Sequence, residues 1–232
     1  MSSLKKFVES SIGKKVVMAI TGLALFFFLI IHLIGNLTLF SSDPALFNGY
    51  AHKLHTLKPL VITAEIFLLA FFIMHIVSGV SVAIGKRKAR PISYYKTASA
   101  GGASKKTISS STMIITGIVI LVFTVIHIKT FKYGPSIAEG YSIDFEGETV
   151  RDLHRLVVEK FSQLPYVLFY VLCMLFLGFH LRHAFWSAFQ SLGIHHPRST
   201  PVLYGMGLFC SILLATGFIL LPLWIYCRGA GG

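Results

Sequence analysis

Four histidines lie inside long apolar stretches of the chain: His32, His75, His127 and His180. A single histidine in such a place is more often a hydrogen-bond partner between helices than a ligand, but one in each of four stretches favours a functional site. Two imidazoles that face each other can supply the two axial ligands of a haem b. Such an iron has no open position for oxygen, so the chemistry expected of these residues is electron transfer.

The stretches that hold these histidines are long enough to be transmembrane helices. Of the 232 residues, 54% are hydrophobic and only 13% are charged, about half the charged fraction of a soluble domain. A bilayer crossing takes about 20 residues, and five apolar runs reach that length, near 16–40, 60–84, 111–131, 165–187 and 202–226. We therefore expect an all-α integral membrane protein, with five transmembrane helices in one bundle and a single domain over residues 1–232.

The charges between the runs predict the orientation of the helices. Residues 85–110 carry seven lysines and arginines and no acid, and their Ser, Gly, Ala and Lys content predicts a flexible loop, whereas residues 132–164 carry four bases against six acids. Because cytoplasmic loops are basic, the N-terminus is expected in the cytoplasm. This layout explains most of the net charge of +12 without nucleic acid. In the outer segment, five apolar residues recur at helical spacing and predict a short amphipathic helix: Val150, Leu153, Leu156, Val157 and Phe161.

The depth of the four histidines sorts them into two pairs. The first and third spans run outward, and His32 and His127 lie in their later parts, in the outer half of the membrane. The second and fourth spans run inward. His75 and His180 each lie 15 residues after the start of the span, about 22 Å from the outer boundary and so in the inner half. We expect His32 with His127 to ligate an outer haem and His75 with His180 an inner one.

Other metal sites suit these residues less well. Zinc usually takes four ligands, and each depth offers two. A proton relay needs carboxylates, which the middle of the spans lacks. The three cysteines form no C-x-x-C motif, which argues against a c-type haem, a zinc ribbon or an iron–sulfur cluster on this chain.

Basic residues near the histidines are candidates for binding haem propionates, which are anions. Arg182 and His183 follow His180 near the inner face, and Lys129 follows His127 near the outer one. Arg182 could instead contact lipid headgroups, and the side chain of Lys129 could instead reach the membrane surface.

The outer end of the second span is a candidate quinone site. Quinone reduction takes up two protons with two electrons, and a carboxylate or histidine at the membrane edge can move those protons. Glu65, Asn48 and His52 lie around the start of this span. Glu65 could instead be an acid near a helix N-terminus that the helix dipole stabilises.

Three motifs resemble a known family. These are SIGKK at 11–15, HLIGNL at 32–37 and HLRHAFWSAFQSLG at 180–193. They resemble the cytochrome b subunit of succinate dehydrogenases and of certain fumarate reductases, in the type where one chain has five spans and two haems b. The resemblance covers essentially the whole chain, and the family ligand positions fall on His32, His75, His127 and His180, in the pairs expected from depth.

The resemblance implies a function as well as a fold. Such subunits anchor a flavoprotein and an iron–sulfur protein on the cytoplasmic face of the bacterial inner membrane, and they pass electrons between the iron–sulfur protein and a membrane quinone, often menaquinone. The inner haem would face the iron–sulfur subunit, and the quinone would bind near the outer haem. The dicarboxylate site would lie on a partner, since no flavin or dicarboxylate motif is found on this chain.

The residues also fit functions other than succinate oxidation. Some fumarate reductase relatives have a glutamate two residues before the ligand in the fourth span, where this chain has Gly178. That departure favours succinate dehydrogenase over a quinol:fumarate reductase. The chain could also be the cytochrome b subunit of another quinone-linked dehydrogenase, or a haem-free transporter. A transporter is disfavoured because the chain has no inverted repeat.

Overall fold

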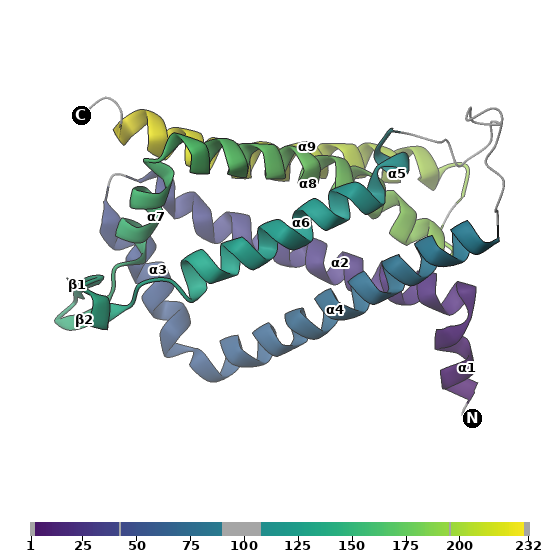
Figure 1. Cartoon of the computed structure of the whole chain (residues 1–232), viewed down its shortest axis with the longest axis horizontal. Coiled ribbons are helices and arrows are strands. Elements are labelled where there is room, and N and C mark those ends of the chain that lie inside the picture. The colour runs from purple at the N-terminus through teal and green to yellow at the C-terminus, as the bar shows by residue number, and fades with distance from the viewer. Residues whose placement is uncertain (1–2, 42, 90–107, 195, 230–232) are drawn as a thin grey trace. The chain divides into compact units, whose positions relative to one another are not determined.

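The computed structural model describes residues 3–41, 43–89, 108–194 and 196–229 (Figure 1). Most of the predicted basic loop at 85–110 lies outside the described residues, because they leave out 90–107.

Five helices of the described chain are long and apolar enough to cross a membrane, as the five apolar runs predict. A helix satisfies its own backbone hydrogen bonds, which makes it the stable form of an apolar run in hydrocarbon. A 3-10 turn extends the first of them and a π-helical turn extends the third. Their bounds are α2 (Ser11–Asn36) with η1 (Leu37–Phe40), α4 (Lys58–Lys88), α6 (Met113–His127) with η2 (Ile128–Lys132), α8 (Leu164–Ser191) and α9 (Ser199–Gly229).

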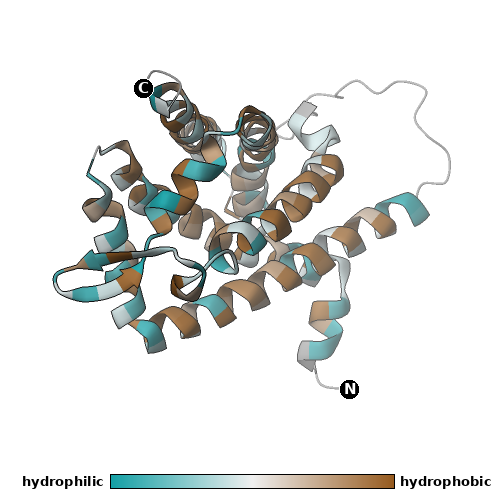
Figure 2. Cartoon of the chain, turned by 60° about the vertical axis from the view of Figure 1, so that its left-hand side comes forward, coloured by the Kyte–Doolittle hydropathy of each residue, from teal (hydrophilic) through white to brown (hydrophobic). Residues whose placement is uncertain are grey.

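Large apolar side chains of these helices are exposed, the reverse of the pattern in a soluble protein. On α4, Leu60, Ile66 and Ile73 are each more than half exposed. Figure 2 shows hydrophobic residues along the long helices and hydrophilic residues near their ends. Acyl chains cover such surfaces in a bilayer. Helix length and surface together make the chain a multi-pass membrane protein.

Short elements lie between the long helices. They are α1 (Ser3–Glu9), α3 (Pro44–Thr56), α5 (Ile108–Ser111), η3 (Ile137–Glu139), β1 (Ser142–Phe145), β2 (Glu148–Arg151) and α7 (Leu153–Phe161). The sequence predicts α7, which buries Leu156, Val157 and Phe161. Its first turn is capped by Asp152, whose carboxylate accepts a hydrogen bond from the N–H of Arg155 at 2.9 Å.

The hairpin formed by β1 and β2 was not expected in an all-α chain. The strands are antiparallel, and Glu146 and Gly147 between them have φ of 54° and 84°. Positive φ at both central residues is the mark of a type I′ turn, whose twist matches that of the strands. The Asp144 carboxylate accepts a hydrogen bond from the N–H of Gly147 at 3.2 Å. Val150, expected in the amphipathic helix, lies instead in β2.

The chain divides into two compact units, and each long helix contributes a segment to both. The first unit comprises residues 1–28, 66–117 and 179–212, and the second comprises 29–65, 118–178 and 213–232. In the core of the first unit, the rings of Phe26 and Phe185 lie 5.2 Å apart, and Trp186 is buried. The core of the second unit includes Leu156 and Val167, both fully buried.

Candidate functional site

The structure brings the four membrane histidines together as two pairs. In the first unit, the rings of His75 on α4 and His180 on α8 have centroids 6.4 Å apart. In the second unit, the rings of His32 on α2 and His127 on α6 lie 5.8 Å apart. These are the pairs expected from depth, and each joins two different helices. Haem ligation by these residues stays a prediction.

The ring separations suit a metal held between two imidazoles. A histidine nitrogen lies about 2 Å from the metal that it binds, so two rings on opposite sides of one ion have centroids about 6 Å apart. Among the residues described, no three or more His, Cys, Asp or Glu side chains gather at one point. Each pair brings two imidazoles together, the number that the axial positions of one haem iron would take.

A threonine and a backbone carbonyl orient His75. The hydroxyl of Thr21 on α2 lies 3.4 Å from Nδ1 of His75, and the carbonyl oxygen of Met18 lies 3.2 Å from the same nitrogen. Thr21 donates its single hydroxyl hydrogen to the carbonyl of Val17 at 2.7 Å, so towards the imidazole it can only accept. Two acceptors at Nδ1 place the ring proton there. The lone pair of His75 is then on Nε2, ready for a metal.

His180 is oriented in the same way. Nδ1 of His180 lies 3.1 Å from the hydroxyl of Thr116 on α6. That hydroxyl donates back along its own helix, within reach of the carbonyls of Thr112 at 3.2 Å and Met113 at 3.1 Å. Thr116 therefore accepts from Nδ1–H of His180. Ligating histidines commonly carry a partner on the other ring nitrogen, which fixes the tautomer and raises the basicity of the ligand.

A glycine follows each of these threonines, and Gly22 makes room for the imidazole of His75, whereas a Cβ at Gly117 would touch His180 only at ordinary contact distance. A Cβ at Gly22 would lie 3.0 Å from Cε1 of His75, and a Cβ at Gly117 would lie 3.7 Å from Cε1 of His180. The same Thr–Gly dipeptide recurs in α9, where a Cβ at Gly217 would lie 2.7 Å from a methyl group of Leu33. Thr21, Thr116 and their glycines were not predicted as site residues. The repeated dipeptide in the first, third and fifth spans was the signal available for finding them.

Aromatic rings surround His127. Its Nδ1 lies 3.1 Å from the hydroxyl of Tyr170 on α8. Phe123 stacks on the imidazole at 5.5 Å and 24°, and Phe131 lies 5.4 Å away. A phenol can donate or accept, so Tyr170 holds the ring without choosing its tautomer. This side of the second pair is lined by aromatic rings.

His32 has a different environment. Its ring lies 5.9 Å from that of Phe218 on α9. The side-chain amide of Asn36, one turn further along α2, donates to the carbonyl of His32 at 2.7 Å, and the same nitrogen lies 3.5 Å from Nε2 of the imidazole. Asn36 was not predicted as a site residue.

The propionate candidates lie on α8 and in η2. Arg182 is exposed and His183 is half-buried, and both line a small pocket between α8 and α9 in the first unit. Arg182 follows His180 by two residues, about 200° around the helix, whereas His183 follows it by three and lies closer to its face. Lys129, in η2, is exposed. Binding of propionates by these side chains stays a prediction.

The quinone candidates have partners in the second unit. Glu65 forms an ion pair with Lys132 at the end of η2. His52 lies 3.5 Å from the carboxylate of Glu148 in the hairpin. Asn48 is almost fully buried. No contact found among the described residues joins Glu65 to either His52 or Asn48.

Asn48 joins α3 to the start of α7. Its amide donates to Oδ1 of Asp152 at 2.8 Å, and its carbonyl oxygen accepts from the N–H of His154 at 2.9 Å. Both ends of the amide are therefore engaged in packing one helix on another. A role of Asn48 at a quinone stays a prediction.

Comparison of the chain with protein-family models, with curated proteins and with solved structures found no match.

Proposed function

We propose that the chain is a di-haem cytochrome b subunit that anchors a succinate dehydrogenase to the membrane. The observation that carries the proposal is the pairing of four membrane histidines, His75 with His180 and His32 with His127, at 6.4 and 5.8 Å. A haem iron held by two imidazoles exchanges single electrons and leaves no site for oxygen.

The surroundings of the first pair support this assignment. Thr21 and Thr116 accept from the Nδ1–H groups of His75 and His180, which orients both rings with Nε2 available. The absence of a Cβ at Gly22 lets His75 approach α2. The residues present therefore fit an axially ligated haem.

The partners are proposed from the family resemblance and from charge. We propose that a flavoprotein and an iron–sulfur subunit dock on the cytoplasmic side. Electrons then pass to a membrane quinone, for which we propose menaquinone. In the segments of the first unit, Glu9 is the only acidic residue against thirteen lysines and arginines. Such an excess attracts acidic partner surfaces at this end of the helices, which would lie in the cytoplasm of a bacterial cell.

The test is a dithionite-reduced minus air-oxidised spectrum of the purified chain, with haem quantified by pyridine hemochrome. Two b-type haems per chain are expected. Replacing either His75 or His180 by Ala should remove one haem, and replacing either His32 or His127 should remove the other. His55→Ala, at an exposed histidine of α3, is the control and should keep both.

Several outcomes would contradict the proposal. No haem in protein from a haem-replete host would remove electron transfer and leave a transporter as the better interpretation. Loss of the same haem from His75→Ala and His127→Ala would contradict the pairing. Partner subunits that copurify and oxidise formate or hydrogen in place of succinate would keep the haem assignment and overturn the succinate one. Net fumarate reduction by quinol in cells would show that electrons flow from quinol to fumarate, opposite to the direction proposed here.

A further inference from the structure

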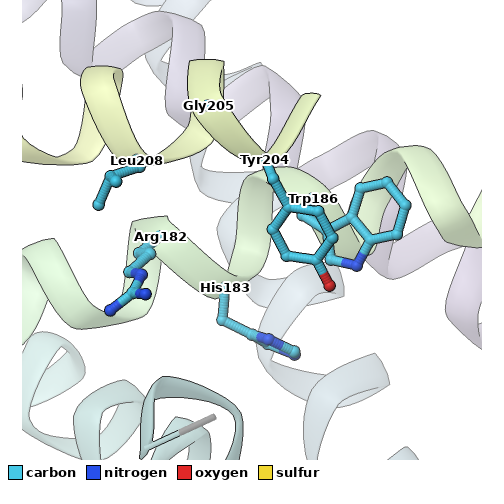
Figure 3. A pocket seen from close by; sticks show the side chains of 6 residues that line it. All are labelled: Arg182, His183, Trp186, Tyr204, Gly205 and Leu208. Atoms are coloured by element: carbon cyan, nitrogen blue, oxygen red, sulfur yellow. The ribbon is translucent and has the colours of Figure 1, made fainter. Parts of the chain in front are cut away.

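A pocket of about 210 Å³ opens between α8 and α9 in the first unit. Figure 3 shows Arg182 and Leu208 at one end of the hollow, the rings of Trp186 and Tyr204 at the other, and His183 between them. The pocket is small, which suits one charged headgroup with part of its chain.

The pocket presents a cation, Arg182, that pairs with no acidic residue in the described part of the chain. Among the residues that the structure describes, no carboxylate forms an ion pair with Arg182, and the three ion pairs found there involve other residues. The segments of the first unit supply no acid other than Glu9. An exposed guanidinium with five donors is a binding site for a phosphate or carboxylate. Since no described carboxylate pairs with it, this guanidinium is open to an anion from outside the chain.

The other walls are those of a membrane-interface site. Trp186 is buried and stacks on Tyr204, with ring centroids 4.3 Å apart and planes at 24°. Trp and Tyr concentrate at the level of lipid headgroups. Leu208, one turn beyond Tyr204 on α9, is 42% exposed and continues the pocket into the apolar face of the helix. A ligand here meets a cation at its head and hydrocarbon along its tail.

We infer that this pocket binds one anionic phospholipid, with the phosphate on Arg182 and an acyl chain along Leu208. The charge distribution predicts the cytoplasmic side for this end of α8 and α9, and basic pockets between helices on that side suit anionic headgroups. The pocket is lined by neither histidine pair, although Arg182 and His183 are also the propionate candidates.

The test uses the full purified chain, stripped of lipid in a nonionic detergent. Native mass spectrometry then counts lipids retained as phosphatidylglycerol is added. One saturable phosphatidylglycerol per chain is expected, with phosphatidylcholine of the same acyl chains at least about tenfold weaker. Arg182→Gln should weaken phosphatidylglycerol about tenfold or more, the effect of losing a charge-assisted hydrogen bond.

A steric variant gives an independent test. A Cβ at Gly205 would meet nothing within 4 Å, so Gly205→Leu should fold and fill the pocket, and phosphatidylglycerol should then be lost without any change of charge. Two matched controls should retain the lipid. Arg198→Gln removes an arginine from the same end of α9, and Gly85→Leu adds the same side chain at another glycine with open space around it. Circular dichroism confirms helix content for each variant.

Four results would overturn the inference. These are equal binding of phosphatidylcholine, equal loss from Arg198→Gln, full displacement by millimolar inorganic phosphate, and unchanged binding in Gly205→Leu. If Arg182→Gln lost a haem and kept its phosphatidylglycerol, Arg182 would belong to a propionate and not to a lipid. Haem content measured on the same samples therefore separates this inference from the proposed function.

Discussion

Replacing Thr116 by Val tests whether the first histidine pair is tuned through its threonines. The change keeps the shape of the side chain and removes the hydroxyl that lies 3.1 Å from Nδ1 of His180. For His180, Thr116 is the one acceptor found at Nδ1 among the described residues. His75 has a second acceptor, the carbonyl of Met18 at 3.2 Å. The effect should therefore be larger for Thr116→Val than for Thr21→Val.

The size and sign follow from the hydrogen bond. A partner at Nδ1–H makes a ligating imidazole more basic and favours ferric iron, so its loss should raise the midpoint potential of one of the two proposed haems. Such a bond contributes about 1 kcal/mol. Since 59 mV corresponds to about 1.4 kcal/mol for one electron, the full value is about 40 mV. We expect a rise of about 20–40 mV for Thr116→Val and less than half of that for Thr21→Val.

The assay is an optical redox titration of the purified chain, fitted with two one-electron components. Thr124→Val is the matched control, because the hydroxyl of Thr124 donates to the carbonyl of Ile120 on its own helix. A shift in Thr124→Val as large as in Thr116→Val would show a general effect of lost hydroxyls. A larger shift in Thr21→Val than in Thr116→Val, or none in either, would refute the assignment of these threonines.

Three further predictions concern packing and pH. Gly22→Ala places a Cβ 3.0 Å from His75, so the imidazole ring must shift. We expect thermal denaturation to show about 1–3 kcal/mol of destabilisation. Gly79→Ala, where the nearest atom belongs to Met18 at 3.8 Å, should not destabilise the protein. Asn48→Leu removes the amide that bonds to the N–H of His154 and to the carboxylate of Asp152. Hydrogen exchange should then show about 2–4 kcal/mol less protection of α7. Gln163→Ala, at an exposed residue, is the control and should leave the protection unchanged. Hydrogen bonds from Tyr141 and Arg155 lower the pKa of Glu159 below its ordinary value of 4.5. Because the pKa of Glu159 is lower in the folded state, its carboxylate stabilises the fold above pH 4.5, and this contribution is lost as the pH falls further. The protection of α7 against hydrogen exchange should therefore decrease in acid. Glu159→Gln should make that protection less dependent on pH.

The long helices could be predicted because hydrocarbon leaves so few options. An apolar run of about 20 residues has to be a helix to satisfy its backbone, and all five predicted runs are long helices in the structure. The expected pairs also follow from counting along such helices, since depth is nearly proportional to residue number. His75 and His180 each lie 15 residues after the start of the predicted span, and their rings are neighbours in the structure.

The hairpin was missed because its turn signal is weak. Asn-Gly or Asp-Gly would mark a type I′ turn clearly, but the chain has Glu146–Gly147 there, and Glu146 is the one residue other than glycine with positive φ among those described. The apolar Val150 also fits the helical spacing of α7, so the helical pattern in the sequence covered both strand β2 and helix α7. Helical spacing alone does not separate a strand residue from the helix that follows it.

The partners of the histidines could not be predicted because they lie on other helices. Spacing within one span says which residues share a face, but it does not say which face of α2 meets α4. The repeated Thr–Gly dipeptide marks Thr21 and Thr116 in the sequence, but only the packed helices show that they contact His75 and His180. The same holds for Asn48. Its polar side chain near the start of the second span suggested a quinone site, and in the structure it contacts Asp152 and His154 and so joins two helices.

The π-helical turn η2 comes directly after His127, and the N–H of Tyr133 bonds to the carbonyl of Ile128 five residues earlier. Such a turn holds one residue more than an α-helical turn. In a regular helix, one inserted or deleted residue rotates everything beyond it by about 100°. Here the wider turn takes up that rotation, so the segment from Tyr133 to the hairpin can change its length by a residue while His127 keeps facing His32. Insertions and deletions should therefore be tolerated just after His127 and rejected within Met113–His127, where they would turn His127 away from His32.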